Sequence, residues 1–214
     1  EFMFSELMPK MMVRTKQKLQ EGNGLFVYPG SHLDFDHALL FASTKYVFID
    51  PDYKHYGVKG ITNKLEKIGL KYDIKKVVKD KSKRLMNMVL DINHAGRTRE
   101  IVLLADDAIR LNNKNEYPFS KGDLYDMFFF KQPSPPKYSV NIKQFCYEKG
   151  DIGKILSRIR PGCFYFETGA NTNHSNDSFR LIDEGLTSCW TIRFDDNELM
   201  YVNSRLFEKT LIGT

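Results

Sequence analysis

The chain has 214 residues, with 32 Lys and Arg against 27 Asp and Glu, and 42% of its side chains are apolar. We expect one domain over residues 3–214, because chains divide into domains only above about 250–300 residues. The 13% aromatic content excludes a low-complexity disordered chain, because these rings supply enough apolar area to offset the entropy of the chain. The dipeptide before Met3 is interpreted as a cloning remnant.

Three features predict a reduced, cytoplasmic chain. The first 20 residues carry charges throughout, which is unlike a secretory signal, and no apolar run approaches the ~18 residues of a membrane-spanning helix. The three cysteines, Cys146, Cys163 and Cys189, are odd in number and lack metal-ligand spacing. We therefore expect no membrane contact, no disulfide and no metal site.

The net charge is +5, and basic residues are densest from Lys71 to Arg84. Asp73 and Asp80 interrupt this stretch. The pattern favours a solvated face over a track for phosphates, so the charge permits a nucleic-acid partner without arguing for one.

The first elements follow a strand–turn–helix order. Residues 5–20 have an amphipathic pattern that predicts a helix, and residues 25–28 form a continuous apolar run that is typical of a buried strand. A turn at Pro29-Gly30-Ser31 comes next. Ser31 and Asp34 have the spacing of a capping box and predict a helix that continues through residues 38–41.

The middle of the chain predicts a second strand at residues 46–49 and a helix that Thr62 caps and Gly69 ends. Residues 71–98 have two interpretations, a helix or a hairpin, and are treated as an insertion. A third strand is expected at residues 101–105.

The last third predicts strands at residues 126–130 and 163–166, with a helix from Asp151 to Ile159 between them. A short helix is expected at residues 179–184. Residues 189–194 and 199–203 are close enough in sequence to pair as an antiparallel hairpin.

Strands that alternate with helices predict an α/β fold. We expect a doubly wound, mostly parallel seven-stranded sheet with an antiparallel C-terminal hairpin at its edge. Ligands of such sheets lie beyond the carboxyl ends of the strands. Polar or flexible residues follow the first four predicted strands at these ends: Gly30, Asp50, Asp106 with Asp107, and Lys131.

These residue types predict a nucleoside site. Gly30 lets backbone approach a ligand, and a carboxylate at Asp50 can accept both hydroxyl hydrogens of a ribose. Alternatively, Asp50-Pro51-Asp52 only forms a turn that ends the strand. The turn after residue 28 lacks the three glycines of a dinucleotide fingerprint, and no Gly-Lys-Ser/Thr motif is present, so a ligand without a pyrophosphate fits better.

Three segments resemble the class I S-adenosylmethionine-dependent methyltransferases, over about residues 20–205. The first is Tyr28-Pro29-Gly30-Ser31 together with Asp50, and the second is residues 103–108, which include Asp107-Ala108. The third, residues 155–166, is similar to that family's helix, Arg-Pro-Gly turn and fifth strand. In that architecture the seventh strand inserts beside the fifth. The antiparallel pair expected at residues 189–194 and 199–203 matches this arrangement.

This resemblance implies that S-adenosylmethionine is the cofactor and that the activity is methyl transfer. Gly30 would border the methionine part, Asp50 would hold the ribose and Asp107 or Asp106 would face the adenine. The implied cofactor bed comprises Tyr28, Pro29, Gly30, Ser31, Asp50, Pro51, Asp106, Asp107, Ala108 and Lys131. The family's first motif has an acidic residue and further glycines where this chain has Tyr28 and Pro29, and Asp34 or Asp36 is a candidate replacement.

The methyl acceptor stays open between a small molecule, RNA and protein. The segment after Phe130 lacks the signature of enzymes that methylate base amines, and no Pro-Cys pair offers a nucleophile toward a pyrimidine. A catalytic base is required only for an oxygen or a protonated nitrogen. Candidates are His32, His37, Asp52, Tyr53, His55, Lys131 and His174. The alternatives are a catalytically inactive scaffold with this fold and, less favoured, a nicotinamide oxidoreductase.

Overall fold

The computed structural model describes residues 13, 15, 24–36, 41, 43–94, 96–131, 149–168, 178–193 and 196–211. Within these ranges, the side chains of residues 131, 149–152, 168 and 186–203 are outside the description. Of the predicted helix over residues 5–20, only Val13 and Thr15 are described, and both are helical.

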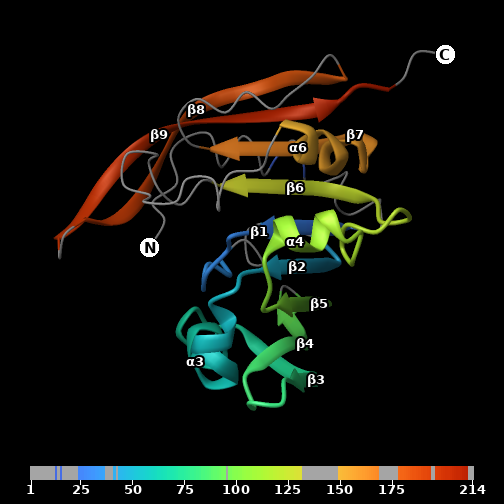
Figure 1. The fold of residues 1–214 in the computed structure, drawn as a ribbon. Helices are drawn as coiled ribbons and strands as arrows, with labels where there is room; N and C mark the ends of the chain where they lie inside the picture. The colour runs from blue at the N-terminus through green and yellow to red at the C-terminus, as the bar shows by residue number, and fades with distance from the viewer. Residues whose placement is uncertain are drawn as a thin grey trace.

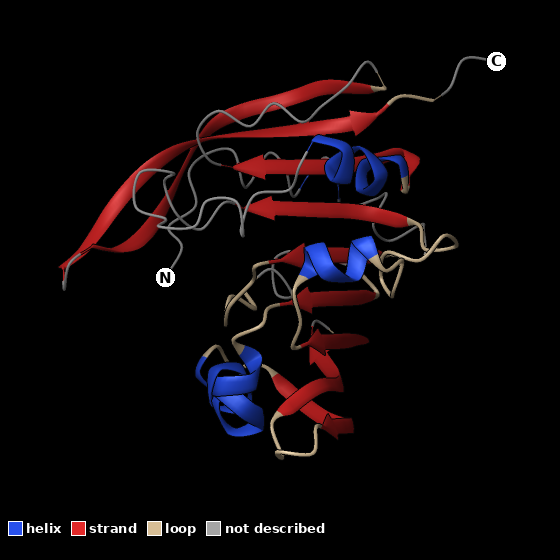
Figure 2. Ribbon diagram, viewed as in Figure 1, coloured by secondary structure: helices blue, strands red, loops and turns tan. Residues whose placement is uncertain are grey.

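A nine-stranded sheet organises the molecule, in the spatial order β3-β4-β5-β2-β1-β6-β7-β9-β8 (Figures 1 and 2). The five central strands, from β5 to β7, pair in parallel. The strands are β1 (Leu25–Pro29), β2 (Lys45–Ile49), β3 (Lys71–Lys79), β4 (Leu85–His94), β5 (Arg97–Leu104), β6 (Tyr125–Lys131), β7 (Ile159–Thr168), β8 (Phe179–Arg193) and β9 (Asp196–Lys209).

The expected count of seven strands is wrong, because residues 71–94 add two. They form the antiparallel hairpin β3–β4, and β4 pairs with β5 at the edge of the parallel strands. Met88, Leu90 and Ile92 are buried at every second position of β4, which is the period of a strand with one covered face. This periodicity explains why the segment forms a hairpin and not the alternative helix.

The closing antiparallel pair is confirmed. β9 lies between β7 and β8 and pairs antiparallel with both, so the last strand of the chain inserts beside the fifth parallel strand. The short helix expected at residues 179–184 is wrong, because β8 already begins at Phe179. Leu181 pairs with Phe207 there, and an irregularity before Asp183 shifts the register.

Helices cover both faces of the sheet (Figure 1). They are α3 (Tyr53–Lys67), α4 (Ala108–Asn113) and α6 (Lys149–Ser157). Phe26 and Tyr28 of β1 belong to the core cluster that includes α3, and Leu25 and Val27 belong to the cluster that includes α4 and α6. Because neighbouring residues of β1 point into opposite cores, the strand is apolar throughout. No helix among the described residues is long and apolar enough to span a bilayer.

The start of α3 differs from the prediction. The helix begins at Tyr53, and the Thr62 hydroxyl donates to the carbonyl of Lys59 one turn earlier, so Thr62 is not a cap. Gly57, with φ of 61°, interrupts the helix. Gly69 follows the last turn with φ of 79°, which confirms the predicted stop.

The helix predicted after β1 does not begin at Ser31, since residues 31–36 form turns and irregular backbone; residues 37–40 lie outside the described residues. Both side chains of the expected capping box have other partners. The Ser31 hydroxyl is 2.6 Å from the Tyr53 hydroxyl, and the Asp34 carboxylate accepts a hydrogen bond from Tyr28. A capping box needs those oxygens for backbone N–H groups, so these tertiary contacts replace it.

Candidate functional site

The register of the sheet brings two predicted site residues, Gly30 and Asp50, level with the end of β5. Pro29 pairs with Ile49, and Ile49 pairs with Leu104, so these three residues end their strands side by side. Gly30 and Asp50 are the next residues of the first two strands. Because neighbouring strands are about 4.8 Å apart, the row from Gly30 to the end of β5 spans roughly 10 Å.

This row lies at the point where the strand order reverses. β1 pairs with β2 on one side and with β6 on the other, so the chain builds outward in both directions from β1. In open α/β sheets, ligands bind beyond the carboxyl ends of the strands at this position. The parallel register, extended along β6, places Lys131 level with Gly30.

Gly30 makes the turn out of β1. Its N–H donates to the carbonyl of Ile49 at 2.8 Å, and its φ of 65° lies in the left-handed region. A Cβ at this position would meet nothing within 4 Å. The glycine is therefore required by its backbone conformation, and the space beside it is open on the protein side.

Two buried tyrosines support this turn. Tyr28 donates from its hydroxyl to Asp34 at 3.0 Å, and the Tyr53 hydroxyl shares a hydrogen bond with Ser31. Burial raises the pKa of both tyrosines, and nearby carboxylates raise the pKa of Tyr28 further. Tyr53 therefore keeps its proton at neutral pH and is unsuitable as the general base for which it was a candidate.

Asp50 is buried, and both of its carboxylate oxygens already accept backbone hydrogen bonds. Oδ2 accepts from the N–H of His32 at 2.8 Å, and Oδ1 accepts from the N–H of Asp52 at 2.9 Å. Only 3% of the side chain is exposed. This geometry is what the strand-ending turn requires, and a ribose could reach the carboxylate only if residues 31 and 32 moved.

The imidazole of His32 completes a small polar cluster. Its Nδ1 is 3.8 Å from Asp50 and 3.7 Å from Asp52. In the described part of the chain, these three residues are the only group of three potential metal ligands whose atoms lie within 4.8 Å of one another. Since backbone N–H groups engage Asp50 and the other two side chains are about half exposed, the strand-end turn accounts for the cluster without a metal ion.

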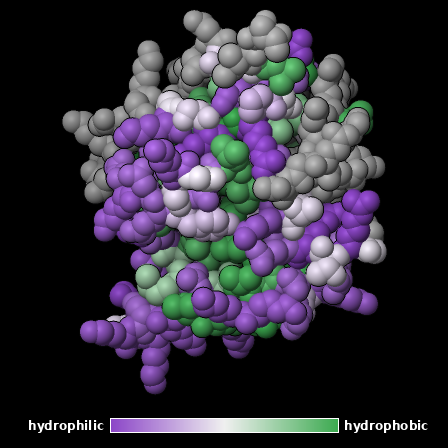
Figure 3. Space-filling view, turned by 90° about the vertical axis from the view of Figure 1, so that its right-hand side faces the viewer, coloured by the Kyte–Doolittle hydropathy of each residue, from purple (hydrophilic) through white to green (hydrophobic). Residues whose placement is uncertain are grey.

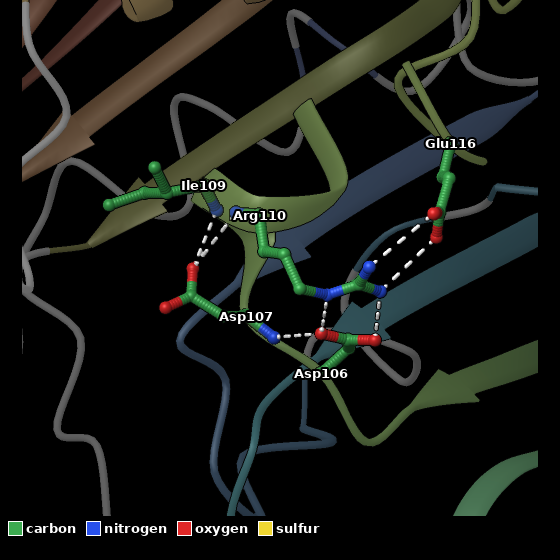
Figure 4. A network of polar contacts seen from close by, with 5 residues as sticks. All are labelled: Asp106, Asp107, Ile109, Arg110 and Glu116. Atoms are coloured by element: carbon green, nitrogen blue, oxygen red, sulfur yellow. Dashed lines mark hydrogen bonds and ion pairs between the residues drawn. The ribbon is translucent and has the colours of Figure 1, made fainter. Parts of the chain in front are cut away.

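Asp106 and Asp107 follow β5, and their side chains have different partners (Figure 4). Asp106 is held by Arg110, whose Nε donates at 2.6 Å and whose Nη2 forms a second ion-pair contact. Arg110 also reaches Glu116 at 3.1 Å. Burial raises the pKa of the Asp106 carboxyl, but the hydrogen bonds from Arg110 and from the N–H of Asp107 outweigh it, so the pKa is lowered overall.

Asp107 is exposed and caps α4. Its Oδ1 accepts from the N–H of Ile109 at 2.7 Å and of Arg110 at 3.3 Å. Its other carboxylate oxygen has no protein hydrogen-bond partner among the described residues, and Figure 4 shows this oxygen pointing away from the helix. Of the two neighbouring carboxylates, Asp107 is therefore the one with an acceptor still available for a ligand.

The other predicted site residues are spread around this edge. Pro29 is buried at the end of β1, Pro51 is exposed in the turn before α3, and Ala108 is the buried first residue of α4. His55 is exposed on α3. His37 and His174 lie outside the described residues, as does the side chain of Lys131.

The cysteines are away from this edge or outside the description. Cys163 is free and buried, and its thiol is 3.6 Å from the Asp126 carboxylate near the amino ends of β6 and β7. Cys146 and the side chain of Cys189 lie outside the described residues.

Sequence reasoning missed Arg110 and Glu116, which engage Asp106. The spacing of four residues between Asp106 and Arg110 is the helical ion-pair spacing and was a usable signal. The backbone N–H of His32 that occupies Asp50 left no trace in the sequence, because any residue type can supply an N–H.

No protein-family model and no curated protein matches this chain. Several solved structures resemble its fold. One is the N-methyltransferase NodS from Bradyrhizobium japonicum WM9 in complex with S-adenosyl-L-homocysteine, which is 12% identical, with a TM-score of 0.47 and coverage of 94% of this chain and 84% of that one.

TrmN from Thermus thermophilus is also 12% identical, with a TM-score of 0.46 and coverage of 92% of this chain and 48% of that one. A precorrin-6y C5,15-methyltransferase from Geobacter metallireducens GS-15 is 10% identical, with a TM-score of 0.43 and coverage of 97% and 95%. At identities this low, these likenesses do not assign an activity to this chain.

Proposed function

We propose that the chain is an S-adenosylmethionine-dependent methyltransferase whose acceptor is not yet identified. The observation that carries the proposal is the row formed by Gly30, Asp50 and the end of β5 at the switch point of the sheet. These positions lie at the carboxyl ends of β1, β2 and β5, the first three parallel strands along the chain, as the resemblance in sequence implies. The insertion of β9 between β7 and β8 also supports this architecture.

The residues at this edge fit the cofactor in part. The turn at Gly30 leaves open space where a side chain would stand, and Asp107 has an unused carboxylate oxygen that can accept a hydrogen bond from the adenine amino group. Each Asp50 oxygen keeps a second lone pair for a ribose hydroxyl, but the side chain is only 3% exposed, so the turn at residues 31–32 must open to admit the ribose. The proposal therefore includes a rearrangement of residues 31–36 on binding.

When bound, the cofactor supplies a methyl group on a positively charged sulfur. The protein's task is to hold that group in line with the attacking atom and to exclude water, and such orientation contributes roughly 7–11 kcal/mol. His32 and Asp52 are about half exposed beside the row and can take a proton from an acceptor that must lose one. An acceptor with a free lone pair needs no base.

Calorimetric titration with S-adenosylhomocysteine tests the proposal, and Asp107→Asn is the informative variant. Asparagine also caps helices well, so α4 is preserved. The asparagine oxygen then caps α4, so the asparagine NH₂ group faces the adenine amino group. Both groups are hydrogen-bond donors, so no hydrogen bond can form between them. We expect affinity to fall about tenfold, the equivalent of about 1.4 kcal/mol.

The matched control is Glu184→Gln, which makes the same change of charge at an exposed position on β8. Its affinity for S-adenosylhomocysteine should equal that of the unmodified chain. Equal binding by Asp107→Asn and the unmodified chain would refute the adenine assignment. Transfer of labelled methyl groups into cell extract, fractionated into RNA, protein and small molecules, would then identify the acceptor class.

A second candidate function is a scaffold that uses this fold without the cofactor. The observation in its favour is that both oxygens of Asp50 are occupied by the protein's own N–H groups. The turns at residues 31–36 also lack a helix N-terminus beside Gly30. A folded chain that gives neither heat nor a shift in melting temperature with millimolar S-adenosylhomocysteine would favour the scaffold.

A further inference from the structure

Positive charge is concentrated in one part of the molecule. Residues 53–84 contain eleven Lys and Arg against three Asp and Glu, a net charge of +8. Because the whole chain carries +5, the remaining residues together carry −3. The basic segment comprises α3, β3 and the turn into β4, which together form one end of the sheet (Figure 1).

Most of these cations lack an acidic partner. Lys75 is paired with Asp73 and Asp91, and Arg84 is paired with Asp80. Within the described residues, the other nine basic side chains form no ion pair with a carboxylate, and all are exposed or half exposed. They are Lys54, Lys59, Lys64, Lys67, Lys71, Lys76, Lys79, Lys81 and Lys83.

Protection of the sheet edge does not account for this charge. Lysines on an edge strand prevent pairing with other chains, and β3 is such a strand. That explanation covers the lysines of β3 but not the four on α3 or the two in the turn at residues 80–84. Figure 3 shows hydrophilic side chains projecting from the lower end of the molecule, where Figure 1 places α3 and the hairpin.

The basic hairpin extends to the same edge as the candidate site. β4 runs antiparallel to β5, and Asn87 pairs with Leu104, so the turn at residues 80–84 lies beyond the carboxyl end of β5. The N–H of Ala105, next to Asp106, donates to Met86 of β4 at 2.9 Å. The hairpin turn is therefore a direct neighbour of the segment that leads to Asp107.

The start of α3 borders the site as well. Lys54 lies close enough to Asp106 to contribute to the lowered pKa of that carboxyl. Tyr56 is 38% exposed. Partial burial raises the pKa of its hydroxyl, and the carboxylates of Asp52 and Asp50 raise it further, which places Tyr56 near the site. Lysines that can bind phosphates, together with an exposed ring that can stack on a base, are the combination that binds single-stranded nucleic acids.

We propose that α3 and the β3–β4 hairpin form a binding surface for a single-stranded nucleic acid. The lysines of the hairpin turn and of α3 contact phosphates, and Tyr56 stacks on a base at the end of the surface nearest to Asp106. The binding surface stands independently of the cofactor; that the bound strand is also the methyl acceptor rests on the proposed function.

The test uses fluorescence anisotropy of a labelled 20-nucleotide single-stranded RNA with the full chain and no cofactor. With about five phosphates contacted, the logarithm of affinity falls with the logarithm of salt at a slope near −3.5, or about 100-fold between 50 and 200 mM salt. K79Q/K81Q/K83Q removes three of these contacts and should flatten the slope by about 2. At 50 mM salt this variant should bind at least about tenfold more weakly.

The matched control is K114Q/K121Q/K154Q, which removes the same charge at exposed positions beside or on α4 and α6, away from the hairpin. It should bind like the unmodified chain. Tyr56→Leu keeps an apolar side chain without the ring and should weaken binding about tenfold.

Three results would overturn the proposal. The first is an absence of salt-dependent RNA binding at 50 mM salt, and the second is equal loss in both triple variants. The third is sedimentation of the chain with vesicles of 30% anionic phospholipid that the RNA does not reverse, which would identify a membrane surface instead. Because these measurements need no cofactor, binding of RNA without methyl transfer would contradict only the proposed function.

Discussion

Replacement of Asp50 by alanine separates the structural role of this carboxylate from its proposed role toward a ligand. The side chain is buried and accepts the backbone N–H groups of His32 and Asp52 at 2.8 and 2.9 Å. A hydrogen bond to a charged group contributes about 1.5–3 kcal/mol, and a buried donor left without a partner costs about 1–3 kcal/mol. We therefore expect Asp50→Ala to lower the free energy of unfolding by about 3 kcal/mol.

The assay is urea unfolding followed by circular dichroism, with a parallel thermal melt. For a chain of this size, a loss of ~3 kcal/mol corresponds to a decrease in melting temperature of about 6–12 °C. Asp52→Ala is the matched control. It removes the same charge two residues away, but the carboxylate of Asp52 caps no backbone N–H, so its effect should stay within about 0.5 kcal/mol.

An Asp50→Ala variant that loses no more stability than Asp52→Ala would refute the structural role. Loss of ligand binding in Asp50→Ala alone would not establish contact with a ribose, because the same substitution releases the turn at His32 that borders the site. For this reason Asp107→Asn, which preserves the local fold, is the better test of cofactor binding.

Two further predictions concern the same edge. Gly30→Ala should lower the free energy of unfolding in urea by about 1 kcal/mol, because a φ of 65° is unfavourable for a residue with a side chain even where space is available. Gly30→Asn should lower it less, because asparagine tolerates this backbone conformation better. Equal stability of the two variants and the unmodified chain would contradict this argument. Arg110→Ala should cost about 0.5–1 kcal/mol at pH 7, since the guanidinium is about one-third exposed. The pKa of Asp106 is lowered in the folded state, so the stability difference between the unmodified chain and Arg110→Ala should be complete above the ordinary Asp pKa of ~4. The difference should vanish as the pH falls through the lowered pKa. A stability difference that persists at about pH 2 would contradict the role of the Asp106–Arg110 pair.

The central strands could be predicted because their signal is local. Residues of β1 and β2 are buried on both faces, so a continuous apolar run is sufficient to identify them. The alignment of Gly30, Asp50 and the end of β5 followed from the same information, because carboxyl ends of parallel strands share one edge. The hairpin β3–β4 was ambiguous because β3 is largely exposed and its residues carry little apolar periodicity.

The errors in the helix starts arose where a side chain with a strong capping preference has another partner. Ser31 and Asp34 have the spacing of a capping box, but Tyr53 and Tyr28 engage their side-chain oxygens. Thr62 is a good helix cap by type, yet it lies within α3 and bonds to the preceding turn. The Ser31–Tyr53 contact cannot be read from sequence spacing, because it joins the turn after β1 to α3.

The occupied carboxylate of Asp50 sets an energetic condition on the proposed function. If the N–H of His32 must leave Oδ2 before a ribose binds, the lost bond opposes binding by about 1.5–3 kcal/mol, or roughly 10- to 150-fold in affinity. Two ribose hydroxyl bonds can offset that cost, whereas a ligand held by Asp107 alone leaves the His32 bond in place. On that condition, cofactor binding through Asp50 changes the hydrogen bonds of residues 31–36, and amide hydrogen exchange at His32 should respond to S-adenosylhomocysteine. Unchanged exchange at His32 in a complex that has formed would place the ribose away from Asp50.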